Sequence, residues 1–151
     1  RLSESRLEGA KDIVGLENEL ADSKVANQRL LNAEDAETRQ LGTANQQLIN
    51  TITTTIADYG VRAKEAVLGK VVELAKQSLR EMTIAAQQKQ LTTQDITNLT
   101  TLSASLAETL GNIPMLEGLD KDEKAAAQRN LLERIQSIHG IVERLVGIVG
   151  I

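Results

Sequence analysis

The sequence contains no cysteine, phenylalanine or tryptophan, and only one histidine, one proline and one tyrosine among its 151 residues. The lack of cysteine excludes disulfides, zinc–thiolate sites and thiol catalysis. It does not decide the compartment, because both oxidising and reducing compartments hold cysteine-free proteins. A single histidine excludes a metal site built on a histidine pair, and no glycine-rich phosphate-binding loop occurs.

Aromatic side chains and a basic face are the usual means of binding nucleic acid. The sequence has a single tyrosine and no such face. The net charge is -4, and lysine and arginine do not cluster. Single strands are bound by aromatic stacking and duplexes by dense positive charge. We therefore expect no nucleic-acid partner. The many carboxylates have the positions of helix caps and surface charges, so we also expect no enzyme activity, no catalytic or metal-binding residue and no cofactor.

Aliphatic side chains at helical spacing dominate what is present. Leucine, isoleucine, valine and alanine recur at steps of three and four residues, the period of one face of a helix. The clearest such stripe contains Leu68, Val72, Ala75, Leu79, Met82 and Ala86. Two further stripes follow it, and together the three predict a core that includes Leu79, Leu106, Ile135, Ile138 and Val142. His139 follows the core position Ile138, and we predict a partly exposed structural role for it.

Local motifs predict where helices begin and end. Thr92 precedes Asp95 by three residues, the spacing of a capping box, and Asp120 precedes the last stripe in a similar way. Pro114 lies in the glycine-flanked segment 111–119, which we predict to be the clearest loop.

The first turn has two candidate positions, Gly42 and Gly60. A turn at Gly42, followed by a capping-box pattern at residues 43–46, divides the chain into helices of about 60 and 70 Å, at roughly 1.5 Å per residue. A turn at Gly60 leaves a first helix of about 86 Å without a partner of matching length. We therefore predict a turn near Gly42. The expected fold is all-α, an antiparallel up-down-up-down four-helix bundle that forms one domain over residues 1–151.

Glycines 140, 147 and 150 lie on one face of the last predicted helix, where we expect close packing against a neighbouring helix. The segment 141–151 becomes steadily more apolar. It fits either the end of a core helix or the approach to a membrane span.

The segment Asp35-Ala36-Glu37-Thr38-Arg39-Gln40-Leu41-Gly42 resembles the Asp-Ala-Glu-Thr-Gly-Gln-Arg-Gly signature of CHASE3 domains at six of its eight positions. The next residues, 43–46, depart from the aromatic and glycine residues that usually follow. The wider group contains the four-helix extracytoplasmic sensor domains of bacterial chemoreceptors and sensor kinases. The resemblance implies ligand sensing that is passed by small helix movements to a membrane span. It also implies a small anionic ligand bound by arginines, for which Arg39, Arg62 and Arg80 are the candidates.

Three functions therefore compete. The first is a ligand-sensing domain of a bacterial transmembrane receptor, on the periplasmic face of the inner membrane and tethered through flanking segments. The alternative is a non-enzymatic structural or adaptor bundle that binds partner helices, with a cytoplasmic location. A translocator whose last helix enters a membrane is the third. We also expect a homodimer, because the aliphatic faces of the first and last helices are wider than one seam requires.

Overall fold

The computed structural model describes residue 18 and the ranges 20–61, 66–88 and 91–148. Residues 20–31 are helical. The elements that follow are α2 (Ala36–Val61), α3 (Ala66–Gln88), α4 (Thr93–Gly111), the 3-10 helix η1 (Ile113–Gly118) and α5 (Lys121–Ile148). No residue within these ranges belongs to a strand, so the predicted all-α class is confirmed.

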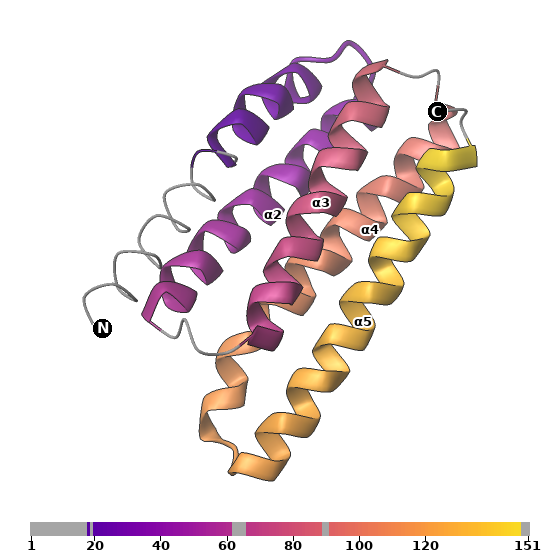
Figure 1. Cartoon of the computed structure of the whole chain (residues 1–151). Helices are drawn as coiled ribbons and strands as arrows, with labels where there is room; N and C mark the ends of the chain where they lie inside the picture. The colour runs from indigo at the N-terminus through magenta and orange to yellow at the C-terminus, as the bar shows by residue number, and fades with distance from the viewer. Residues whose placement is uncertain (1–17, 19, 62–65, 89–90, 149–151) are drawn as a thin grey trace.

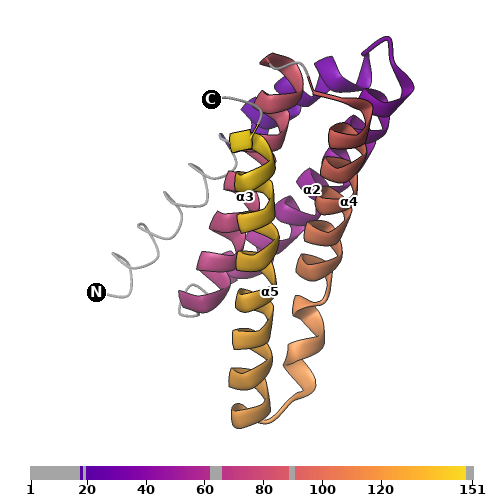
Figure 2. The ribbon, with the colours of Figure 1, turned by 90° about the vertical axis from the view of Figure 1, so that its right-hand side faces the viewer.

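The long helices pack lengthwise as a bundle (Figure 1). The closest neighbours are not consecutive in sequence: α2 packs mainly on α4, and α3 mainly on α5. The contacts of α2 with α3 and of α4 with α5 are smaller. Figure 2 shows α4 and α5 side by side, running upward from the connection through η1 at the bottom of the view. The seam between α3 and α5 therefore joins helices that lie far apart along the chain.

The core is aliphatic, as the composition predicts. Branched and straight-chain residues of α2, α3, α4 and α5 form one cluster of buried side chains. The five predicted core residues, Leu79, Leu106, Ile135, Ile138 and Val142, are all members of it.

The prediction of a turn near Gly42 is wrong, and so is the count of four helices: the single helix of about 70 Å predicted after Gly42 is divided into α2 and α3, and the helix of residues 20–31 precedes them. Gly42 lies inside α2, and the preceding helix ends at Leu31, so the chain turns over residues 32–35. The capping-box pattern at residues 43–46 is also part of α2. Gly60 lies in the last turn of α2, and residues 62–65, between α2 and α3, are outside the described ranges.

Gly42 is needed for a close approach between two helices. A Cβ atom at this position would lie 2.9 Å from the backbone nitrogen of Leu31 and 3.1 Å from the carbonyl carbon of Leu30. Asn27, which is fully buried, donates a hydrogen bond of 2.8 Å from Nδ2 to the carbonyl oxygen of Gly42. The absence of a side chain thus lets the helix of residues 20–31 lie directly on α2.

Two predicted helix starts are confirmed. Thr92 and Asp95 form a reciprocal capping box at the start of α4. The carboxylate of Asp120 accepts the backbone N–H of Glu123 at 2.9 Å, in the first turn of α5. The break before α4 and the end of α4 at Gly111 also match the predicted boundaries. The segment 111–119, predicted to be the clearest loop, is instead mostly the 3-10 helix η1.

Asp35 supplies a cap that the sequence analysis missed. Its carboxylate accepts hydrogen bonds from the hydroxyl and the backbone N–H of Thr38, in the first turn of α2. These two hydrogen bonds lower the pKa of Asp35 below its ordinary value. Arg39 closes the same turn by donating from Nη1 to the carbonyl oxygens of Ala33 and Glu34, at 2.8 and 2.6 Å. The Asp-Ala-Glu-Thr segment therefore has a structural role at a helix start.

We expect Asp35→Ala to lower the melting temperature at pH 7, because it removes this cap. Since the pKa of Asp35 is lower in the folded chain than in the unfolded chain, its stabilising effect is present above the unfolded value, near 4, and is lost as the pH falls through the folded value. Thermal unfolding followed by circular dichroism at pH 7 and below pH 3 measures both effects. Asp58→Ala, at an exposed position near the other end of α2, is the control and should not lower the melting temperature. Equal losses at both pH values would contradict the assignment.

Candidate functional site

Two groups of polar side chains lie inside the bundle. The first joins three helices through Asn45 of α2. Ser103 of α4 donates to Asn45 Oδ1 at 2.8 Å, and Asn45 Nδ2 lies 3.4 Å from Thr83 Oγ1 of α3. Thr83 donates in turn to the carbonyl oxygen of Leu79. Every polar side-chain atom of this group has a partner, so it fixes the helix register and leaves no group free for a ligand.

The second group is centred on His139, which α5 directs toward α3. Only 8% of the residue is exposed. Across the seam, Ser78 Oγ and His139 Nδ1 lie 2.7 Å apart. On α5 itself, Glu143 follows four residues later on the same face, and its Oε1 lies 2.8 Å from His139 Nε2. The prediction of a partly exposed histidine is therefore wrong: the ring is buried and both of its nitrogens face polar groups.

The hydrogen bonds of Ser78 fit a proton on Nδ1. The Ser78 hydroxyl has a partner in the carbonyl oxygen of Leu74 at 2.9 Å. A hydroxyl has one hydrogen to donate, so in the tautomer with a proton on Nδ1, Ser78 Oγ accepts from that N–H. The other nitrogen, Nε2, is then the atom that faces the carboxylate of Glu143. A ring held in this way presents Nε2 at a fixed position in the seam.

Glu81 of α3 completes this group. It lies three residues after Ser78, and its carboxylate comes within 4.8 Å of the ligand atoms of His139 and Glu143. Glu81 Oε2 is buried and has no hydrogen-bond partner. Burial raises the pKa of Glu81; the negative charge of Glu143 acts in the same direction, and His139 opposes both. We call Glu81, His139 and Glu143 the seam cluster.

The seam cluster directs one imidazole nitrogen and two carboxylates toward one region between α3 and α5. Such a set attracts positive charge. Nε2 of His139 is the partner of the Glu143 carboxylate, but Glu81 Oε2 has no hydrogen-bond partner. Among the residues that the structure describes, these three form the group of histidine and acidic side chains that could hold a metal ion. The four-residue spacing of His139 and Glu143 can be read from the sequence. The position of Glu81 beside them cannot, because Glu81 belongs to α3.

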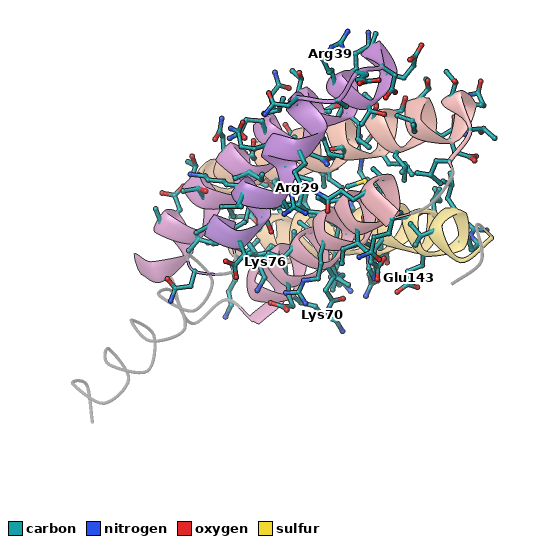
Figure 3. The ribbon with its side chains drawn as sticks, turned by 90° about the horizontal axis from the view of Figure 1, so that it is seen from above. Arg29, Arg39, Lys70, Lys76 and Glu143 are labelled. Atoms are coloured by element: carbon teal, nitrogen blue, oxygen red, sulfur yellow. The ribbon has the colours of Figure 1, made fainter. Side chains whose placement is uncertain are left out.

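The arginines predicted to bind an anion do not form part of this cluster. Arg39 is exposed at the start of α2, where it binds the turn that precedes the helix. Figure 3 shows Arg39 and Glu143 at opposite edges of the bundle. Arg80 is exposed on α3, and Arg62 lies outside the described residues. An anion site at Arg39, Arg62 and Arg80 stays a prediction.

The glycines of α5 do not make the predicted close contacts. A Cβ atom at Gly140 or Gly147 would meet no atom within 4 Å. Gly150 lies outside the described residues. The close approach at Gly42 is instead the place where packing requires a glycine.

Comparisons with protein-family models, with curated proteins and with solved structures return no match. Over the part of the chain that the structure describes, no helix combines the length and the apolar character that crossing a membrane requires.

Proposed function

We propose that this chain is a ligand-sensing helical domain of a bacterial transmembrane receptor, on the periplasmic face of the inner membrane. The proposed arrangement of α2 to α5 is up-down-up-down, and the alternating course of successive helices in Figure 1 supports it. The observation that carries the functional proposal is the seam cluster. It is a buried polar group between two helices, and one of its carboxylate oxygens has no partner.

A ligand at the seam cluster would contact α3 and α5 together. Glu81 belongs to α3, whereas His139 and Glu143 belong to α5. Because the three groups lie on two helices, drawing them together moves one helix relative to the other, and packed seams have discrete arrangements. The two groups on α5 lie within ten residues of its end at Ile148. A shift of α5 is therefore the proposed signal.

The location can be tested in the organism that makes the protein. We expect the full-length gene product to fractionate with membranes and to carry apolar runs of about 20 residues on both sides of this domain. Polar sequence on both sides, with the product in the soluble fraction, would contradict the receptor role and favour the adaptor bundle. A single apolar hairpin next to the domain would favour the translocator. Alkaline carbonate extraction distinguishes integral from peripheral membrane association.

One sequence feature that would favour the adaptor alternative is explained by packing within this chain. Polar positions in the first helix, Asn27 among them, suit a helix that pairs with a partner. Asn27 is instead buried within this chain and donates to Gly42. Val25 of the same helix is 67% exposed, but no other large, exposed apolar residue is described on that helix.

A homodimer, weak in the isolated domain and firmer when its ends are tethered, remains our prediction. The apolar surface for it is smaller than the sequence indicates, because Leu20 belongs to the core and Leu131 and Leu132 pack against it. Ile141 is 37% exposed on α5 and is available for contact. Sedimentation velocity from micromolar to millimolar concentration measures the association. A strict monomer over this range, with and without a fused dimerising coiled coil, would contradict the prediction.

A further inference from the structure

We propose that the seam cluster, Glu81 with His139 and Glu143, binds a divalent transition-metal cation of the Zn²⁺ type. The inference rests on the proposed function in taking this cluster as the ligand site, and it names the chemical class of the ligand. It differs from the anionic ligand that the family resemblance implies, and it replaces the expectation that the chain has no metal-binding residue.

The types of ligand atom select the class of cation. Imidazole nitrogen is a good ligand for zinc and for the later first-row metals, whereas Mg²⁺ and Ca²⁺ prefer oxygen ligands alone. Carboxylate oxygens complete many zinc sites together with histidine. A neutral imidazole and two carboxylates carry two negative charges in total, which balance the charge of a divalent cation. The expected preference is therefore Zn²⁺ over Mg²⁺ and Ca²⁺.

The geometry needs only small shifts: the longer separations between ligand atoms must shorten, and the contact of Nε2 with Oε1 must lengthen. The ligand atoms lie within 4.8 Å of one another, and Nε2 of His139 is already 2.8 Å from Oε1 of Glu143. Bonds of about 2.0–2.2 Å in a tetrahedral site place ligand atoms roughly 3.3–3.6 Å apart. Glu143 is exposed and Glu81 is partly exposed, so their side chains can rotate to close this difference. Three protein ligands leave a fourth position for water.

Two independent observations support a cation at this point. Glu81 Oε2 is buried without a partner, which a bound cation would correct. Ser78 Oγ lies 2.7 Å from Nδ1 of His139, where it can accept a hydrogen bond from Nδ1–H while its own hydroxyl donates to the carbonyl oxygen of Leu74. Metal-binding histidines commonly donate their second ring N–H in this way, which fixes the ring and directs the other nitrogen at the metal. Ser78 is thus a positioning residue.

Isothermal titration of the tag-free protein with ZnCl₂ tests the proposal. We expect one saturable Zn²⁺ site per chain, with no comparable heat from MgCl₂ or CaCl₂. Glu81→Gln, His139→Gln and Glu143→Gln should each weaken Zn²⁺ binding at least about tenfold, and Ser78→Ala about 10–100-fold. Glu133→Gln is the matched control, because Glu133 is an exposed glutamate on α5 outside the cluster.

Circular dichroism verifies that each variant is folded before it is titrated. Glu143→Gln is the variant least able to disturb folding, because the Glu143 side chain is 57% exposed. X-ray absorption at the zinc edge then identifies the ligands, and we expect one imidazole together with oxygen atoms. Absence of saturable binding overturns the proposal. Equal affinity in wild type, in the three cluster variants and in Ser78→Ala also overturns it, because the zinc is then bound elsewhere.

The zinc titration and the membrane fractionation test the metal site and the receptor role separately. Specific zinc binding by a product that fractionates as a soluble protein would retain the metal site and reject the receptor. A membrane-anchored product whose domain binds no zinc would retain the receptor and reject the metal site.

Discussion

Replacing Gly42 with alanine should destabilise the protein by about 1–3 kcal/mol, the usual cost of adding atoms to a packed interior. The added Cβ would lie 2.9 Å from the backbone nitrogen of Leu31. Backbone atoms cannot rotate aside as a side chain can, so the helix of residues 20–31 must move away from α2. That movement also weakens the hydrogen bond between Asn27 and the carbonyl oxygen of Gly42.

Helix propensity alone predicts the opposite result, because alanine is a better helix former than glycine by about 0.8–1 kcal/mol. A loss of stability in Gly42→Ala therefore reports the close contact. Gly140→Ala is the matched control: it lies in the helix interior of α5, and its Cβ would meet nothing within 4 Å. We expect Gly140→Ala to be neutral or to stabilise by up to about 1 kcal/mol. Urea unfolding of both variants measures the difference. A Gly42→Ala protein as stable as wild type would show that the first helix does not lie on α2.

Ile138→Ala should cost about 2–5 kcal/mol, the range for truncating a buried isoleucine or leucine. Ile138 is a member of the core cluster on α5. Truncation removes apolar atoms from a packed site and leaves a cavity that the aliphatic neighbours fill only in part.

Ile141→Ala provides a control of identical chemistry. Ile141 lies one helical turn away and is 37% exposed, so its truncation should cost much less. Urea unfolding at pH 7 gives both free energies of unfolding from the same type of curve. A loss below about 0.5 kcal/mol for Ile138→Ala would be far less than the usual cost of truncating a buried side chain. It would show that this face of α5 points to solvent.

Features that act over a few residues were predictable from the sequence. The start of α4 depends on Thr92 and Asp95, which are three residues apart and bind each other's backbone. The core positions of α3, α4 and α5 follow from helical spacing, because one face of each helix is apolar. Neither prediction requires knowledge of which helix packs on which.

Features that depend on the packing partner were not predictable. A glycine marks either a turn or a close contact, and only the position of Leu31 shows that Gly42 marks a contact. The turn itself lies at residues 32–35 and ends in the cap that Asp35 forms with Thr38, a local signal that was missed because no glycine or proline marks the turn. The sequence cannot pair Ser78 with His139, which are 61 residues apart. The seam cluster depends on the packing of α3 beside α5, which the sequence does not show.

A ligand at the seam cluster should move α3 and α5 relative to each other. The chain has no cysteine, so two can be introduced for labelling, at Gln77 on α3 and Gln136 on α5, both of which are exposed. The measurement is the distance between spin labels at these positions, by electron paramagnetic resonance with and without saturating Zn²⁺. We predict that Zn²⁺ changes this distance in the wild-type background and leaves it unchanged when His139→Gln is also present. An identical distance distribution with and without Zn²⁺ in the wild-type background would contradict the claim.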